Sequence, residues 1–232
     1  MILLVNGDSH TAGAEAVNAY AFAEDDPKYV NMQRSPHPDN LKASWGLKLS
    51  KMLSATPLVL AESASSNERI LRTTNQWLGE NLDSDVFIII QWSTWEREEW
   101  LIDQEYFQVN ASGIDDVPDS HKQRYKEFVA DVNWTKCTTN WFKRIKAYHE
   151  YLDSQSIKHV FFNGNSDFSK IKDRYDFGKS YIDPYTSEGT YHGWLQANGY
   201  KTVSKASYHY DAQAHSAWSK FMVRYLLDNK LV

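Results

Sequence analysis

The chain has 232 residues, of which 42% are hydrophobic and 24% are charged, and its formal net charge is −5. This length suits one α/β domain with insertions and is sufficient to bury a core. The acidic balance gives no electrostatic basis for binding nucleic acid or an anionic membrane surface. A single cysteine, Cys137, excludes internal disulfides and fits a reducing compartment.

Nothing in the sequence indicates export or membrane insertion. Met1 leads directly into the first apolar run, so we expect no signal peptide. The longest apolar runs, such as residues 86–90, are far too short to span a bilayer. We therefore expect a cytoplasmic protein that acts on a small molecule, with no nucleic-acid or membrane partner.

The amino terminus contains the most informative stretch. Residues 2–5 are apolar without alternation, as in a strand buried on both faces of a parallel sheet. The run stops at Asn6-Gly7-Asp8-Ser9, a cluster of turn formers. Ligands of open α/β sheets bind at the carboxyl ends of strands, where a turn presents Ser9 beside its own backbone N–H. A strand followed by an ordinary helix cap is the competing interpretation, since Asp and Ser are common cap residues.

Strands and helices alternate along the chain. Proline-rich turns predict a long irregular loop over 10–40, and a helix follows from about Asn40 with Leu41, Trp45, Leu49 and Met52 or Leu53 on one face. The remaining expected strands cover 57–61, 86–90 and 159–162. One expected helix carries Ile70, Leu71, Thr74 and Leu78. A helical pattern covers 122–154, with a break near 133–139. Two further helices are expected near Trp194 and after Asp211.

This alternation predicts an α/β fold, with a parallel sheet of about five strands wrapped on both faces by helices. No repeat or linker suggests a second domain, so we expect one domain over 1–232. Long insertions near 10–40, 95–121 and 164–190 follow the same ends of the strands. The unusual sequence therefore gathers at one rim of the sheet.

Four short blocks occur in order along the chain: 7–9 after the first strand, 64–67 after the second, 91–94 after the third, and 207–218 before and within the last helix. In this order and placement they resemble the SGNH (GDSL-type) hydrolase family, and the resemblance covers essentially the whole chain. It implies a flavodoxin-like three-layer α/β/α sandwich that hydrolyses esters, with Ser9 attacking a carbonyl while a histidine removes its proton.

The resemblance also implies an oxyanion hole, in which the backbone N–H groups of Ser9 and of a block-two residue are joined by a side-chain donor from block three. The chain departs from the family here. The family's glycine falls at Ala64 or Ser65, and its asparagine aligns with Ser93. Losing one oxyanion donor typically costs about 2.7–4 kcal/mol of transition-state stabilisation. Unless Ser93, Thr94 or Asn67 substitutes, we expect a slow or narrow enzyme.

Two histidines compete for the role of the base. His209 precedes Asp211, which is placed to cap the last helix, so His209 falls in the loop where the family's histidine belongs. The family's aspartate then falls at Ala206, which leaves a dyad unless another carboxylate orients the ring. The alternative pairs Asp211 with His215, one helical turn apart. We favour His209 as the base, His215 as a packed helix residue and Asp211 as a plain cap.

Other polar and aromatic residues near the blocks are candidates for substrate contacts. Arg97 can hold an anionic group or simply be solvated, and Trp92 can wall the site or pack in a loop. Asp8, Asn67 and Thr94 complete this set. His149 and Glu150 lie on a helix without a second histidine at the zinc-binding spacing, so we expect no metal and no cofactor.

These features favour a cofactor-free serine hydrolase that cleaves a small acyl ester through Ser9 and His209. Aromatic residues in the insertions favour an O-acetylated carbohydrate as substrate. Two alternatives stay open. One is a non-catalytic ligand- or carbohydrate-binding protein on a degenerate scaffold of this family, and the other is a flavodoxin-like ligand binder unrelated to it.

Overall fold

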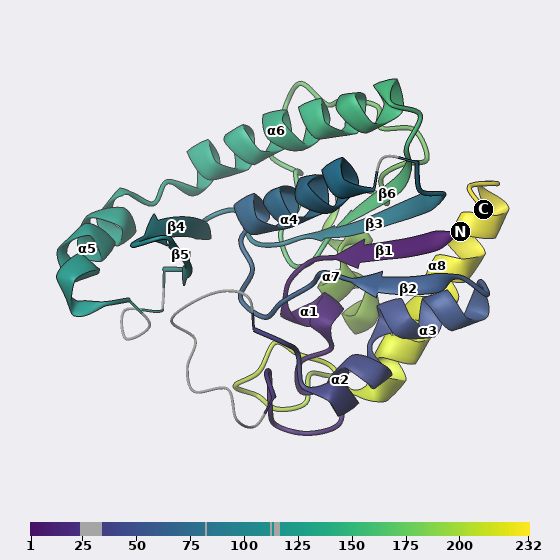
Figure 1. Cartoon of the computed structure of the whole chain (residues 1–232), viewed down its shortest axis with the longest axis horizontal. Coiled ribbons are helices and arrows are strands. Elements are labelled where there is room, and N and C mark those ends of the chain that lie inside the picture. The colour runs from purple at the N-terminus through teal and green to yellow at the C-terminus, as the bar shows by residue number, and fades with distance from the viewer. Residues whose placement is uncertain (24–33, 82, 112, 114–116) are drawn as a thin grey trace.

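The computed structural model describes residues 1–23, 34–81, 83–111, 113 and 117–232. Within them a parallel sheet has four strands in the order β2-β1-β3-β6 (Figure 1). These strands are β1 (Ile2–Asn6), β2 (Thr56–Val59), β3 (Val86–Trp92) and β6 (Lys158–Asn163). Val5 of β1 pairs with both Val59 and Ile89, so the first strand lies inside the sheet, as its unbroken apolar run indicated. The mixed α/β class is thereby confirmed.

Helices cover both faces of this sheet. Leu3 and Val5 pack with α3 (Trp45–Met52) and α8 (Ala212–Asp228), whereas Leu4 packs with α4 (Asn67–Glu80) and α6 (Trp134–Ser154). Successive side chains of a strand point to opposite faces, so one strand feeds two cores. Since neither face is left to solvent, the strands need no polar alternation.

The helix expected from Asn40 is two helices, α2 (Pro38–Ala43) and α3. Ser44 separates them because it adopts an extended conformation and its hydroxyl accepts a hydrogen bond from the N–H of Leu47. The prediction of one helix with a single apolar face is therefore wrong, and Met52 is 46% exposed. The break expected near 133–139 is confirmed at its start, where Asn133 caps α6 after α5 (Lys122–Asp131).

The insertion over 95–121 is not an irregular loop. It contains an antiparallel hairpin, β4 (Glu98–Ile102) and β5 (Glu105–Val109), whose turn residues Asp103 and Gln104 both have positive φ. That geometry matches a tight two-residue hairpin turn, although the pair lacks the Asn-Gly or Asp-Gly signature. With α5 the hairpin forms a projection on the left of Figure 1 that has its own small core. The buried members of that core are Trp100, Ile102, Phe107, Val109, Val117 and Tyr125.

The other insertions contain little regular structure. After the short α1 (Ser9–Ala12), the described part of 10–40 is irregular up to α2, and residues 24–33 lie outside the described residues. The stretch 164–190 has one short 3₁₀ turn, η3 (Ser187–Gly189), and leads into α7 (Tyr191–Ala197). A further 3₁₀ turn, η2 (Asp119–His121), precedes α5.

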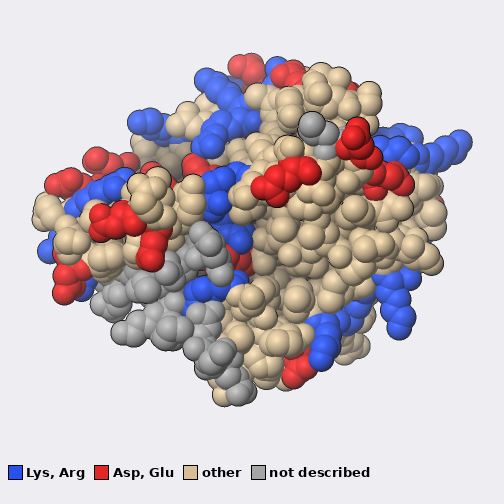
Figure 2. Space-filling view, viewed as in Figure 1, with Lys and Arg blue, Asp and Glu red and all other residues tan. Residues whose placement is uncertain are grey.

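Charge is mixed over the surface shown in Figure 2, with basic and acidic side chains interspersed on the hairpin projection at the left. No helix in the described part of the chain is long and apolar enough to cross a membrane.

Candidate functional site

Ser9 is the first residue of α1, immediately after the carboxyl end of β1. Asp8 caps the helix by accepting a hydrogen bond from the N–H of His10 at 3.0 Å. A Cβ on Gly7 would lie 2.9 Å from the Cβ of Thr11, so the tight turn requires glycine. As the first residue of the helix, Ser9 has no intrahelical acceptor for its N–H, and none is found among the described residues. The turn therefore presents a hydroxyl and an N–H together.

Ser9 lines a cavity of about 370 Å³ at the carboxyl rim of the sheet. His209 and Glu15 line the same cavity, as do Ala64 from the loop after β2 and Arg97 from the segment after β3. The remaining lining residues are His10, Ala21, Ser63, Asn165, Ser204, Ala206, Ser207 and Tyr208. The gathering of these segments at one rim agrees with the arrangement expected for the carboxyl ends of parallel strands.

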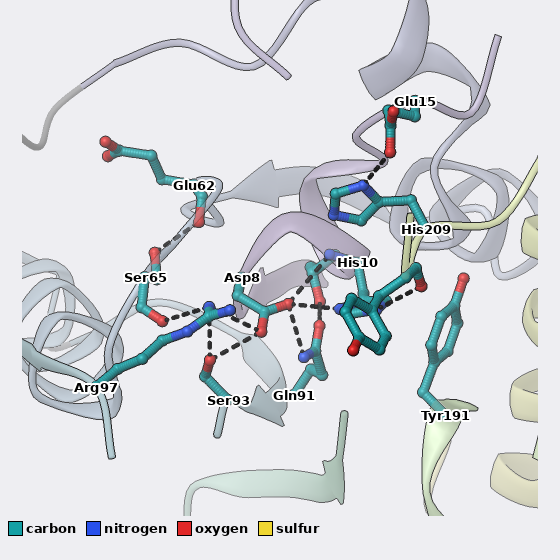
Figure 3. Close-up of polar contacts among 12 residues, drawn as sticks. Asp8, His10, Glu15, Glu62, Ser65, Gln91, Ser93, Arg97, Tyr191 and His209 are labelled. Carbon is teal, nitrogen blue, oxygen red and sulfur yellow. Dashed lines mark hydrogen bonds and ion pairs between the residues drawn. The ribbon is translucent and has the colours of Figure 1, made fainter. Parts of the chain in front are cut away.

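His209 is held by Glu15. Its Nδ1 contacts the Glu15 carboxylate (Figure 3). The same carboxylate also accepts a hydrogen bond from the Ser207 hydroxyl. A hydrogen on Nδ1 leaves the lone pair on Nε2, for which the described residues offer no partner. Burial and the neighbouring His10 lower the pKa of His209 below 6.5, although Glu15 acts in the opposite direction. Burial alone would raise the pKa of Glu15, but the bonds from Ser207 and His209 lower it overall.

His215 and Asp211 lie elsewhere. His215 is 1% exposed, and its Nδ1 accepts a hydrogen bond from the N–H of Trp45 at 3.2 Å. Burial lowers its pKa to about 3, so it is neutral near pH 7. Asp211 is exposed and accepts bonds from the N–H groups of Gln213 and Ala214 as the cap of α8. Neither residue lines the cavity, so the geometry agrees with a packed histidine and a plain cap, and gives Asp211 no orienting role.

The oxyanion candidates divide into free and occupied groups. Ala64 has φ of 67°, the left-handed conformation that favours glycine, and among the described residues no acceptor is found for its N–H. Ser65 instead donates its N–H and its hydroxyl to the carbonyl of Glu62. Ser93 donates its hydroxyl to Asp8 at 2.8 Å and its N–H to the side chain of Asn67 at 2.7 Å. The backbone N–H groups of Ser9 and Ala64 are thus available, and those of Ser65 and Ser93 are not.

Asp8 is 2% exposed and does not line the cavity, and its carboxylate holds the end of β3 and the segment that follows. Gln91 and Ser93 donate to its carboxylate at 2.8 Å, and His10 Nδ1 lies 3.0 Å from it (Figure 3). Burial alone would raise the pKa of Asp8, but His10, Arg97 and Gln91 hold it well below its usual range. Because Asp8 is buried and does not line the cavity, the expected substrate contact by Asp8 is replaced by a structural one.

Three further expected contacts also fall away from the cavity. Trp92 belongs to β3, because that strand extends two residues beyond the predicted 86–90, and it is fully buried against Phe161. Asn67 is fully buried and bonds the backbone of Ser93. Thr94 does not line the cavity, and its backbone carbonyl accepts a hydrogen bond from the Asn67 side chain. These positions are corrected from substrate contacts to packing and loop positioning.

Arg97 is the expected contact that does reach the cavity. Its guanidinium donates to the Ser93 hydroxyl at 3.0 Å, to the Ser65 carbonyl at 3.3 Å and, at 3.4 Å, to Asp8. The side chain is 20% exposed, and its Nε is buried without a partner among the described residues. Arg97 therefore stabilises blocks one, two and three together and keeps donor capacity beside the cavity.

Sequence reasoning missed Glu15, His10 and Ser63. Glu15 lies in the loop after α1 at φ of 60°, and no spacing rule links it to a residue at position 209. His10 follows Ser9 directly, but both of its ring nitrogens face acceptors, Asp8 at 3.0 Å and the Tyr208 carbonyl at 3.2 Å. Ser63 is 4% exposed and its hydroxyl, which has no partner among the described residues, borders the cavity.

Comparison with known proteins gives a family without an assigned activity. No curated protein and no solved structure matches the chain. A family model described as "Family of unknown function (DUF6071)" matches residues 24–191, which include Ala64 and Arg97 but neither Ser9 nor His209. Since the match covers more than half of the 232 residues, the chain belongs to this family.

Proposed function

We propose that the protein is a serine hydrolase of the SGNH type that cleaves a small acyl ester, with Ser9 as the nucleophile, His209 as the base and Glu15 as the orienting carboxylate. One observation carries the proposal. His209 is held through Nδ1 by Glu15 and lines the same cavity as Ser9. A carboxylate on Nδ1 is what a histidine base needs to present the Nε2 lone pair.

The reaction follows from these positions. Ser9 Oγ attacks the acyl carbonyl carbon while its proton passes to His209 Nε2, and Glu15 stabilises the imidazolium that forms. The N–H groups of Ser9 and Ala64 hold the oxyanion. His209 then gives the proton to the departing alcohol, which leaves Ser9 acylated. A water molecule attacks this ester, again losing its proton to His209, and the acid is released with Ser9 restored.

No hydrogen bond joins the Ser9 hydroxyl to His209 in the described residues. Catalytic hydrogen bonds are often long in ligand-free enzymes and tighten when substrate binds. In this proposal the four strands and the helices on both faces represent the flavodoxin-like three-layer sandwich of the family, with one strand fewer than the five we expected. Tyr208, 70% exposed at the edge of the cavity, offers an aromatic surface for an O-acetylated sugar.

The test is covalent labelling with a fluorophosphonate probe combined with hydrolysis of p-nitrophenyl acetate. We expect wild-type protein to be labelled once and to turn over, and Ser9→Ala to lose both properties. Ser120→Ala, at an exposed serine that does not line the cavity, is the matched control and should retain both. Labelling that persists in Ser9→Ala, or wild-type protein that is neither labelled nor active on acyl esters, refutes the proposal.

A second function is favoured by one specific observation. The Ser93 hydroxyl, which aligns with the family's side-chain oxyanion donor, is committed to Asp8. The oxyanion hole then has two backbone donors and lacks the third, side-chain donor. The same cavity therefore suits a non-catalytic binder of acylated carbohydrates. Binding of such a sugar with equal affinity by wild type and Ser9→Ala, without turnover, identifies this alternative.

A further inference from the structure

A second polar cluster lies at the opposite end of the sheet. His149 and Asp153 are one turn apart on α6, and His159 is the second residue of β6. Each offers a ligand atom such that all three atoms lie within 4.8 Å of one another. β6 begins here and ends at the rim that bears Ser9, so this cluster is separate from the proposed hydrolase site.

The hydrogen-bond pattern of the cluster lacks one hydrogen. His159 Nδ1 donates to the carbonyl of Ile157 at 2.9 Å, so its Nε2 carries a lone pair. That lone pair faces His149 Nδ1 at 2.8 Å, while His149 Nε2 faces a carboxylate oxygen of Asp153 at 3.3 Å. A neutral His149 has one ring hydrogen for these two acceptors. A cation shared by the three residues would remove the mismatch.

The geometry points to a transition-metal site, and we propose that His149, His159 and Asp153 bind one zinc ion, with water completing the coordination. Zinc takes imidazole and carboxylate ligands at about 2.0–2.2 Å, and a tetrahedral arrangement places two such nitrogens roughly 3.3 Å apart. The facing nitrogens lie at 2.8 Å, so the two rings must separate by about half an ångström. The Asp153 carboxylate lies 3.3 Å from His149 Nε2 and 4.0 Å from His159 Nδ1, so it must also turn to reach the ion. Asp153 is 58% exposed and is free to turn towards the ion.

The surroundings support a tightly coordinated ion over loosely attracted cations. The Ile157 carbonyl already fixes the ring of His159, as second-shell acceptors do for metal-binding histidines. Asp153 and His159 line a surface hollow of about 300 Å³ that gives an ion access. Lys158 and Lys230 line the same hollow and oppose any cation held by charge alone. We therefore expect zinc to bind and magnesium, which prefers oxygen ligands, not to bind.

The ion would join the end of α6 to the start of β6 across the turn at 155–157, where Ser156 has a positive φ of 57°. Because a ligand that binds only the folded chain stabilises it, zinc would raise the melting temperature. The site has no contact with Ser9 or His209, so its failure and the failure of the hydrolase proposal are distinguishable.

The experiment uses the full chain after removal of metal by a chelator. Isothermal titration with zinc chloride, thermal melting with and without zinc, and the visible spectrum with cobalt as a substitute ion are measured. We expect one zinc per chain, a melting temperature raised by several degrees, and the intense absorption of tetrahedral cobalt. Magnesium chloride at the same concentration should change none of these.

Asp153→Asn and His159→Gln should each weaken zinc binding by about tenfold or more and abolish the cobalt signal. Asp153 is exposed, so that variant should fold, as circular dichroism will verify. Glu150→Gln, which alters an acid on the same helix, and His121→Gln are matched controls that should bind zinc normally. Absence of stoichiometric binding, or binding that survives either ligand substitution, overturns the site. A melting temperature that zinc leaves unchanged also overturns it.

Discussion

Two carboxylates lie near Ser9 in different surroundings: Asp8 precedes it in the sequence, and Glu15 lines the same cavity. Asp8 is 2% exposed and is bonded by Gln91, Ser93 and His10 (Figure 3). The side chain of Glu15 is 27% exposed and holds His209 and Ser207. Both have lowered pKa values, but only Glu15 leaves its partner's other nitrogen open to the cavity. A lowered pKa is therefore shared by both carboxylates and does not separate them. What separates them is the free lone pair on Nε2 of His209, on which the proposed role of Glu15 depends.

The largest expected effect comes from removing His209, the partner of Glu15. His209→Ala removes the proposed base, so we expect kcat/KM for p-nitrophenyl acetate to fall by on the order of 10³–10⁴-fold. His215→Gln keeps an acceptor for the N–H of Trp45 and should retain activity per folded molecule. Steady-state kinetics decide between them, and loss of activity only in the His215 variant would reverse the assignment.

Glu15→Gln should lower kcat by about 10²–10³-fold, because the amide no longer stabilises the imidazolium of His209. The base must be neutral, and its pKa is lowered, so the wild-type rate should reach its plateau from a midpoint below pH 6.5. Glu15 raises that pKa, so the midpoint should move further down in the variant. The exposed Glu80→Gln is the control, and an unchanged pH–rate profile in Glu15→Gln would assign Glu15 a purely structural role.

Asp8→Asn tests whether the buried Asp8 carboxylate stabilises the fold. Removing the charge leaves the Arg97 guanidinium without this buried counter-ion and weakens the acceptor for Gln91 and Ser93, so we expect the free energy of unfolding to fall by about 3 kcal/mol. Because the pKa of Asp8 is lowered, its stabilisation is present above pH 3.8 and disappears as the pH falls further. Urea denaturation at pH 7 measures the loss, with the exposed Asp131→Asn as control. Equal stability of the two variants would remove Asp8 from its structural role.

The smallest effect concerns Ala64, whose φ of 67° strains an alanine. Ala64→Gly should stabilise the protein by roughly 1 kcal/mol, since glycine adopts this conformation without cost. Activity should be kept or modestly raised because the proposed donor is a backbone N–H. Ala130→Gly, at an exposed position within α5, should instead destabilise by about 1 kcal/mol. A loss of stability in Ala64→Gly would contradict this account of the block-two turn.

The sequence by itself determined the four strands of the parallel sheet and the rim at which polar residues gather, but not the antiparallel hairpin β4–β5. Local signals decide these features: unbroken apolar runs at 2–5 and 86–90, and turn formers directly after the first of them. It also placed Asp211 as a cap and His215 in a helix, because capping and helical spacing act within a few residues.

Only the tertiary structure decided which groups meet. The contact between Glu15 and His209, and that between His149 and His159, depend on how loops and elements cross, and no short-range pattern records such pairings. The hydroxyl of Ser93 was available in the sequence and is occupied in the fold, because Asp8 is buried and its carboxylate must be satisfied by neighbouring donors. Trp92 packs in the core and does not contact the cavity, because β3 continues two residues beyond its apolar run.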